Sequence, residues 1–385
     1  MSLPPGTTDF PAPALDVSRE KRAGSRPPLQ RRDEKTVIFA SDNWAGAHSR
    51  IAAGLSAHAP GFEPAYGNGD LDRAVRDRFS EIFEREVAVF FVSTGTAANA
   101  LSLTLANRPG GVAFAHRDAH LAIHEAGAPD YFADGLKLWP VDGKRGLMEP
   151  EALADAIARY PAEFLHTGRA AAVSVTQLTE MGSAYSLEAL DAIAAVAKRQ
   201  DLPLHMDGAR FANALVALDC SPAEMTWKRG VDMLSFGGTK NGCWCAEAVV
   251  LFDPSLAGEF AFIHKRAAQL FSKSRFVSAQ FEAYLHDDLW LETARHANAM
   301  AAKLAVLIRG SRTMRLAWEP DANMIFAVAE KAAAETLRQA GARFYEEAVP
   351  ADFADSVGPG EVLCRFVTSF ATTTEEVDRF GALIG

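Results

Sequence analysis

The stretch VDMLSFGGTKNG, residues 231–242, decides the fold. Its apolar run, VDMLSF, stops at Gly237 and Gly238, and a single lysine, Lys240, follows after Thr239. A short apolar run bounded by glycines is typical of a buried strand, where an ammonium group is expensive unless it is paired or loses its charge. Lys240 is therefore either a loop lysine that reaches solvent or a lysine kept at a strand end for its nitrogen.

Six further apolar runs resemble this one, and helical patterns separate several of them. They span 87–95, 111–116, 136–141, 170–177, 202–207 and 246–252. Near-continuous apolar strands are what a sheet covered on both faces requires. The alternation predicts an α/β fold with a mostly parallel, seven-stranded sheet and helices on both faces.

Composition changes along the chain predict three segments. Residues 1–34 are rich in proline and charge and poor in large apolar residues, so we expect a mobile N-terminal tail. Residues 35–275 carry the alternating pattern of a large α/β domain. A long helix-like stretch, 264–308, then leads to two strand-like runs around another helix. We expect residues 276–385 to form a smaller C-terminal α+β domain.

The composition excludes several classes of protein. The 385 residues carry a formal net charge of −10 without a basic cluster, so nothing suggests nucleic acid as a partner. We see no apolar stretch long enough to span a membrane and no secretory signal. Four scattered cysteines form no disulfide framework, and Cys243-x-Cys245 lacks the spacing of a redox or zinc motif. These features fit a cytoplasmic protein.

Ligands of open parallel sheets lie beyond the carboxyl ends of the strands, so the residues that follow each run matter. Ser93 to Thr96 end the first run and open a helical pattern, where backbone N–H groups suit a phosphate; a plain N-cap by Thr94 or Thr96 is the alternative. Asp207 ends the fifth run, as a ligand-facing carboxylate or as a cap of the next helix. Lys240 follows the next run along the chain.

A phosphate cradle, an aspartate and a lysine at one sheet edge match pyridoxal 5′-phosphate (PLP). In that arrangement the lysine forms a Schiff base with the aldehyde, and the aspartate pairs with the protonated pyridine nitrogen. Partial desolvation lowers the pKa of such a lysine and makes its neutral amine available. The sequence therefore predicts a covalent anchor at Lys240 and a partner carboxylate at Asp207.

The chain past the tail resembles the threonine aldolase and β-eliminating lyase family of fold type I PLP enzymes. The stretch TQLTEMGSAYSLEAL (176–190) is similar to bacterial low-specificity L-threonine aldolases in particular. The other stretches that carry the resemblance are SDN (41–43), YGNGD (66–70), STGTAANALSL (93–103), AHLAIHEAG (119–127), HMDGARFANA (205–214), FGGTKNG (236–242) and CRFVTSF (364–370).

The resemblance implies a role for each matched residue. For the cofactor, it implies the Schiff base at Lys240, the pyridinium partner Asp207, ring stacking by His120 and phosphate binding by Thr94, Gly95 and Thr96. For the substrate, it implies that Arg210 lies near the ring oxygen and the substrate carboxylate, that Ser41 and Arg365 grip this carboxylate, and that Tyr66 borders the site, often from a neighbouring subunit.

One departure concerns the proton of the substrate hydroxyl. Many family members carry a histidine in the loop after the fourth strand, whereas this chain reads Thr179-Glu180-Met181-Gly182. Glu180, His120 or an ordered water then removes the proton, and Glu180 as a solvated loop acid is an equal alternative. His116, His120 and His124, with Glu125 beside them, also have the spacing of a metal site, but His116 falls at a strand end, so we predict no metal.

The resemblance implies a carbon–carbon lyase that cleaves L-threonine, L-allo-threonine and related β-hydroxy-α-amino acids to glycine and an aldehyde. It also implies a homodimer or homotetramer with shared active sites. The alternatives are a PLP enzyme acting on another β-substituted amino acid, such as phenylserine, and a catalytically silent PLP-binding protein.

Overall fold

The computed structural model describes residues 36–385, so the tail predicted for residues 1–34 lies outside the described residues. Residues 37–385 form one compact unit. The boundary expected near residue 275 stays a prediction. No helix of the described part is long and apolar enough to cross a membrane.

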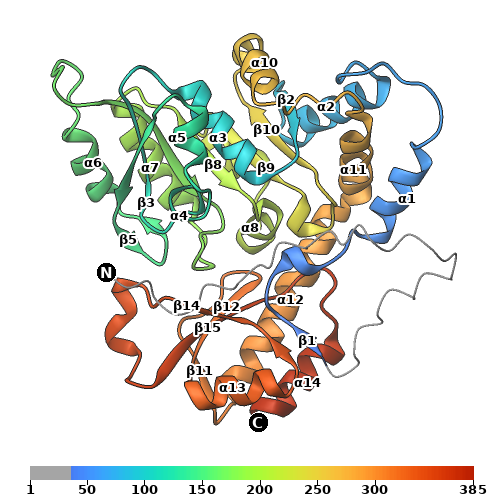
Figure 1. The fold of residues 1–385 in the computed structure, drawn as a ribbon, viewed down its shortest axis with the longest axis vertical. Coiled ribbons are helices and arrows are strands. Elements are labelled where there is room, and N and C mark those ends of the chain that lie inside the picture. The colour runs from blue at the N-terminus through green and yellow to red at the C-terminus, as the bar shows by residue number, and fades with distance from the viewer. Residues whose placement is uncertain (1–35) are drawn as a thin grey trace, which may run out of the picture. The chain divides into compact units, whose positions relative to one another are not determined.

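A seven-stranded sheet forms the centre of this unit (Figure 1). Its strand order is β2-β10-β9-β8-β7-β3-β4, and only β10 runs antiparallel to its neighbours. This confirms the predicted mostly parallel sheet. The strands are β2 (Ala88–Val92), β3 (Gly111–His116), β4 (Lys137–Val141), β7 (Arg169–Thr176), β8 (Leu204–Gly208), β9 (Met233–Gly237) and β10 (Glu247–Leu251).

Helices cover both faces of the sheet because neighbouring side chains of a strand point to opposite sides. On β9, Met233 packs in a cluster with helices α3 and α10, whereas Leu234 and Phe236 pack with α2 and α8. The first face carries α3 (Gly95–Ala106), α5 (Ala128–Phe132) and α10 (Ala257–Arg266); the second carries α2 (Asp70–Ile82), α6 (Pro150–Ala158), α7 (Leu187–Arg199) and α8 (Phe211–Leu218).

The face under α3 also holds a buried polar row. His205, which is fully buried, makes hydrogen bonds of 2.9 Å through both ring nitrogens, to Ser174 on β7 and to Ser235 on β9. Asp207 follows two residues later on β8 and therefore faces the same side of the sheet. The polar row leads from the middle of the sheet toward the edge where the parallel strands end.

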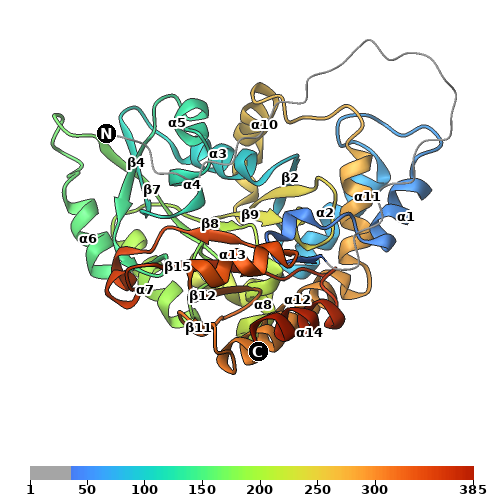
Figure 2. The ribbon, with the colours of Figure 1, turned by 60° about the horizontal axis from the view of Figure 1, so that its bottom comes forward.

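The C-terminal part contains a four-stranded antiparallel sheet, which Figure 2 brings forward. Its strands lie in the order β11 (Met314–Leu316), β12 (Met324–Glu330), β15 (Glu361–Val367) and β14 (Tyr345–Glu347), with α13 (Lys331–Gln339) and α14 (Thr374–Ile384) packed beside them. The two strand-like runs of the sequence are thus β12 and β15.

The start of the described chain is joined to this C-terminal part. Strand β1 (Val37–Ile38) pairs in parallel with β13 (Ala342–Arg343). Phe39 packs edge-on against Phe366 and Phe380, at ring distances of 6.4 and 5.4 Å. Its carbonyl accepts a 2.8 Å hydrogen bond from the backbone N–H of Val367.

The helix-like stretch 264–308 is not one helix. It contains the end of α10, then α11 (Arg275–Leu285) and α12 (Leu289–Arg309). Asp287 and Asp288 have φ values of 50° and 54°, which no α-helix accommodates, and they separate the last two helices. Helix α12 contacts α8 of the large sheet and β12 and α14 of the C-terminal part.

The remaining elements are short. They are α1 (Ser49–Ala57), α4 (His120–Ile123), α9 (Pro222–Met225), the hairpin of β5 (Gly143–Lys144) and β6 (Leu147–Met148), and 3₁₀ turns, among them η1 (Asp42–Trp44) and η3 (Thr239–Asn241).

Candidate active site

A cavity of about 240 Å³ opens at the edge where the parallel strands end. Six residues proposed from the sequence line it: Thr94, Gly95, Thr96, His120, Asp207 and Lys240. Asn99, Glu125 and Glu247 line it as well. The loops after β2, β8 and β9 therefore converge on one space, as the strand-end argument requires.

The start of α3 forms one wall of this cavity. Thr94 caps the helix, and its hydroxyl accepts a 3.1 Å hydrogen bond from the N–H of Ala97. The first N–H groups of a helix have no partner within it and carry the positive end of its dipole. A methyl group added to Gly95 would meet no atom within 4 Å, so this turn borders free space. The helix start thus has both the N-cap and the open N–H groups of an anion site.

Asp207 is fixed by a buried hydrogen-bond network. Its carboxylate, 2% exposed as a residue, accepts bonds from the Asn99 side chain at 2.9 Å and from the N–H of Ala209 at 3.1 Å. The same Asn99 amide donates to Glu125 at 2.8 Å, and Glu125 contacts Nδ1 of His120 at 2.8 Å. Asp207, expected at the ring nitrogen, and His120, expected to stack on the ring, are therefore connected through Asn99 and Glu125.

Hydrogen bonds and burial shift the pKa values of the acids and bases in this network. The hydrogen bond that the Glu125 carboxylate accepts from His120 raises the pKa of His120 above its ordinary value. Burial raises the pKa of Glu125, against the effect of the hydrogen bonds to His120 and Asn99. Both shifts favour the protonated form of the His120–Glu125 pair.

Lys240 lies on η3, directly after β9. Gly237 permits this loop to approach the one after Asp207, because a Cβ on Gly237 would come within 2.6 Å of the Ala209 carbonyl oxygen. The next residue along η3, Asn241, donates to the Tyr284 hydroxyl at 2.8 Å and to the Trp290 carbonyl at 2.7 Å. Lys240 therefore lies on a short loop that contacts hold in place on both sides.

Arg210 is already engaged by a carboxylate of the chain. Its guanidinium binds Asp42 through two hydrogen bonds, of 2.8 and 3.0 Å, and both residues are buried. Asn323 donates a third bond to Asp42 at 3.2 Å. Burial raises the pKa of Asp42, but the guanidinium outweighs this and holds it below the usual value.

The other substrate residues expected from the resemblance do not line this cavity. Arg365 pairs with Glu347 at 2.9 Å and lies over the ring of Tyr345. The hydroxyl of Ser41 caps η1 by accepting from the N–H of Asn43. Tyr66, half exposed, lines a neighbouring apolar cavity of about 210 Å³.

The charged side chains at this site affect the pKa of Glu180. Burial raises its pKa, but the positive charges of Lys240 and Arg210, with smaller contributions from His120 and Arg365, hold the pKa below its usual value. Glu180 is therefore a half-buried carboxylate at neutral pH whose charge is favoured by nearby cations.

The histidine cluster weighed as a metal site does not assemble. His116 contacts the Gly143 carbonyl at 3.3 Å, whereas His120 pairs with Glu125. Between residues 36 and 385 no group of three or more His, Cys, Asp or Glu side chains is arranged to hold a metal ion.

Asn99, Glu125 and Glu247 were not predicted as cofactor-site residues. Asn99 lies one helical turn inside α3 and Glu247 at the start of β10, so neither follows a strand; Glu125 was considered only as a metal ligand. A search for polar residues on the inward face of the helix after the phosphate turn would have found Asn99.

The chain is similar to proteins of known activity. A model of the family described as beta-eliminating lyase matches residues 39–332. A low specificity L-threonine aldolase of Pseudomonas aeruginosa is 38% identical over 344 residues, which cover 89% of this chain and 96% of that protein. A low specificity L-threonine aldolase of a Pseudomonas species is 39% identical over 312 residues, which cover 81% of this chain and 90% of that protein. The solved structure of a Leishmania major threonine aldolase matches with a TM-score of 0.83 at 28% identity, covering 90% of this chain and 98% of that one. This likeness confirms the predicted fold class.

Proposed function

This chain belongs to the beta-eliminating lyase family, and from that premise we propose that it is a PLP-dependent aldehyde-lyase. It cleaves L-threonine, L-allo-threonine and related β-hydroxy-α-amino acids to glycine and an aldehyde, which is acetaldehyde for the two threonines. The observation that carries the proposal is the convergence of Lys240, Asp207 and the start of α3 on one cavity.

The residues present fit PLP by their chemistry. The cavity offers an amine for an aldehyde, a carboxylate for a protonated pyridine nitrogen and a helix start for a phosphate. Glu125 adds a buried carboxylate oxygen, Oε2, without a hydrogen-bond partner in the described chain, so the polar wall has capacity left for a ligand.

When bound, PLP supplies an electron sink for the negative charge that develops at the substrate Cα. Asp207 would stabilise a positive charge on the ring nitrogen. This stabilisation would be largest in the transition state. Asn99 and Ala209 orient this carboxylate by donating hydrogen bonds to it. Lys240 supplies the amine that anchors the cofactor, and His120, aligned by Glu125, covers the ring.

Glu180 would take the β-hydroxyl proton of the substrate. The Cα–Cβ bond then breaks, its electron pair stays with Cα, the aldehyde leaves, and a proton on Cα completes glycine. Glu180 is favoured over His120 because the cations around it keep its carboxylate unprotonated, whereas the hydrogen bond with Glu125 favours the protonated form of His120.

Arg365 would bind the substrate carboxylate in place of Glu347. Glu347 presents the same functional group to the guanidinium that an amino acid would present. Asp42 already occupies Nε and Nη2 of Arg210, so Arg210 would act mainly by its charge. Ser41 and Tyr66 complete the substrate side, and Tyr66 would serve the site of a neighbouring subunit in a homodimer or homotetramer.

The decisive experiment uses purified protein supplied with PLP. We expect a visible absorbance band from the bound cofactor, and equal amounts of glycine and acetaldehyde from L-threonine. Lys240→Ala should lack both the band and the turnover. Ammonia or a keto acid in place of acetaldehyde would point to another lyase or an aminotransferase, and a band without products would point to a silent PLP-binding protein.

A further inference from the structure

Glu247 is a buried acid at the edge of the sheet where ligands bind. Because β10 runs antiparallel, its first residue, Glu247, lies beside the last residues of its parallel neighbours. Glu247 pairs with Gly237 of β9 and with Val92 of β2. The Lys240 loop follows the first of these, and the Thr94 turn follows the second. Glu247 is 7% exposed and lines the same cavity as both.

The surroundings of Glu247 only partly stabilise its negative charge. Its carboxylate accepts two long hydrogen bonds, each of 3.3 Å, from the N–H groups of Gly238 and Thr239. Lys240 is the positive group facing it within residues 36–385. Cys243 and Tyr284 also face it, but burial raises the pKa of each, so both are neutral. Burial raises the pKa of Glu247 to about 7, against the effects of Thr239 and Lys240.

A phosphate at the start of α3 would add negative charge to the cavity that already holds this acid. A phosphate monoester has a second pKa near about 6 and carries close to two negative charges above neutral pH. Two anionic groups in one site disfavour each other, and the group that takes a proton most easily becomes neutral. Glu247, which lies between the Thr94 turn and the Lys240 loop and has a pKa near neutrality, is that group.

We propose that Glu247 is a cofactor-binding residue that takes up one proton when the phosphate group of PLP enters the cavity. This inference rests on the proposed function. The proton balance is simple: one proton moves from solvent to the Glu247 carboxylate, and it returns to solvent when the cofactor leaves. The acid, in addition to the helix start, then determines how cofactor affinity depends on pH.

The test compares PLP with pyridoxal, which has the aldehyde and the ring nitrogen but no phosphate. Binding of each to the cofactor-free protein is measured by absorbance between about pH 7 and about pH 9. The preference for PLP over pyridoxal should fall by up to about tenfold for each pH unit in the wild-type protein. Effects of Lys240 on the aldehyde are common to both ligands and cancel in this ratio.

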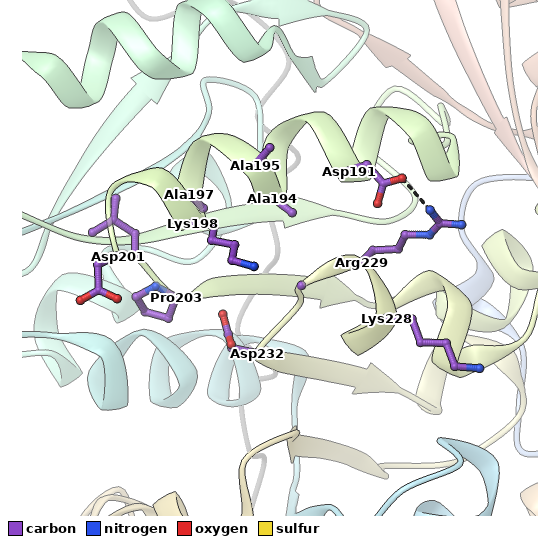
Figure 3. Close-up of a pocket in the computed structure, with 12 residues that line it drawn as sticks. Asp191, Ala194, Ala195, Ala197, Lys198, Asp201, Pro203, Lys228, Arg229 and Asp232 are labelled. Atoms are coloured by element: carbon purple, nitrogen blue, oxygen red, sulfur yellow. Dashed lines mark hydrogen bonds and ion pairs between the residues drawn. The ribbon is translucent and has the colours of Figure 1, made fainter.

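Glu247→Gln removes the titrating proton while preserving the shape of the side chain. In this variant the preference for PLP should be independent of pH. Asp232→Asn is the matched control, because desolvation also raises the pKa of Asp232, but this acid lies just before β9, at the opposite end of that strand. Figure 3 shows it in a separate cavity, which Lys198 and Arg229 also line. This control should keep the wild-type pH dependence.

Calorimetry in two buffers of different ionisation enthalpy counts the protons directly. Near about pH 8 the wild-type protein should take up about one more proton with PLP than with pyridoxal, and phosphorus NMR should show the bound phosphate still as the dianion. Equal uptake for both ligands, or a phosphate that carries the proton itself, would overturn the inference even if Glu247→Gln does not fold.

The two levels of the argument fail differently. If neither PLP nor pyridoxal binds, the proposed function is wrong. If both bind and Glu247→Gln keeps the wild-type pH dependence, only the role of Glu247 is wrong.

Discussion

At the scale of single residues, the site is a balance of charges. Glu180, Asp207, Glu247 and Asp42 are set against Lys240, Arg210 and Arg365, and every one of these arginines already has a carboxylate of the chain as partner. Burial strengthens each of these interactions, because the interior screens charge less than water does. Changing one member therefore alters its neighbours as well.

Replacing Glu180 tests the base for the β-hydroxyl. Glu180→Gln should lower kcat for L-threonine by about 10²- to 10⁴-fold, because an amide cannot accept the proton. The visible band of bound PLP should remain, since Glu180 does not line the cofactor cavity. Steady-state kinetics with a spectrum of the same sample measure both. An unchanged kcat would assign the proton transfer to His120 or to water.

Arg365 and Glu347 form a pair whose members should act in opposite directions. Arg365→Ala should weaken amino-acid binding by about 2–5 kcal/mol, because a charge-assisted hydrogen bond is lost. Glu347→Gln should strengthen it, because the competing carboxylate is removed. Titration with glycine, followed by the change in cofactor absorbance, measures both. Weaker binding in both variants would mean that Glu347 orients Arg365 and does not compete with substrate.

The positions of Lys240 and Asp207 at one sheet edge were predictable because both lie at or near the ends of apolar runs, where polar side chains are unusual. Glu125 and Asn99 were not, because their importance depends on which side chains the fold brings to them. The pairing of Arg210 with Asp42 was also hidden, since 168 positions of sequence separate the two residues.

At the scale of elements, close approach of backbones positions the reactive loops. The Gly237 contact with Ala209 brings the end of β9 against the end of β8, so the spacing between Lys240 and Asp207 depends on a residue without a side chain.

Gly237→Ala should therefore destabilise the protein. The added methyl group would lie 2.6 Å from a carbonyl oxygen, and the strand would have to move, at a loss of about 1–3 kcal/mol. Gly258→Ala is the matched control, because Gly258 lies within α10 with no atom within 4 Å of the added group, and it should stabilise by up to about 1 kcal/mol. Urea unfolding of the two variants measures the difference, and equal stabilities would contradict this reading of Gly237.

The existence of the seven strands followed from hydrophobic runs, and the structure confirms each of them within a few residues. Their order and the antiparallel direction of β10 did not follow, because local sequence does not encode which strands pair. The break between α11 and α12 was missed for a different reason. The spacing of apolar residues does not reveal that two aspartates have positive φ values.

At the scale of the whole molecule, stability depends on polar groups buried inside the large sheet. His205 is held between Ser174 and Ser235, and burial lowers its pKa to about 4. The unfolded chain has the ordinary pKa near about 6.5, so at acidic pH it binds a proton that the folded protein rejects.

The sign of the pH effect follows from this lowered pKa. His205 favours folding fully above about pH 6.5, and its contribution falls as the pH drops from about 6.5 toward about 4, by about 3 kcal/mol in total. Urea unfolding at a series of pH values should show this loss. A His205→Asn variant should be less stable at neutral pH but should have a shallower acid dependence. The same slope in both proteins would exclude His205 as its source.

The joining of β1 to β13 bears on the order in which the molecule is completed during synthesis. Phe39 and Asp42 leave the ribosome near the beginning of the described chain, whereas their partners Val367, Phe380 and Asn323 are made near its end. The strands that carry Lys240 and Asp207 can pair long before that. The nascent protein should therefore be able to capture its cofactor early, while selection of the amino acid waits for the last residues to be translated.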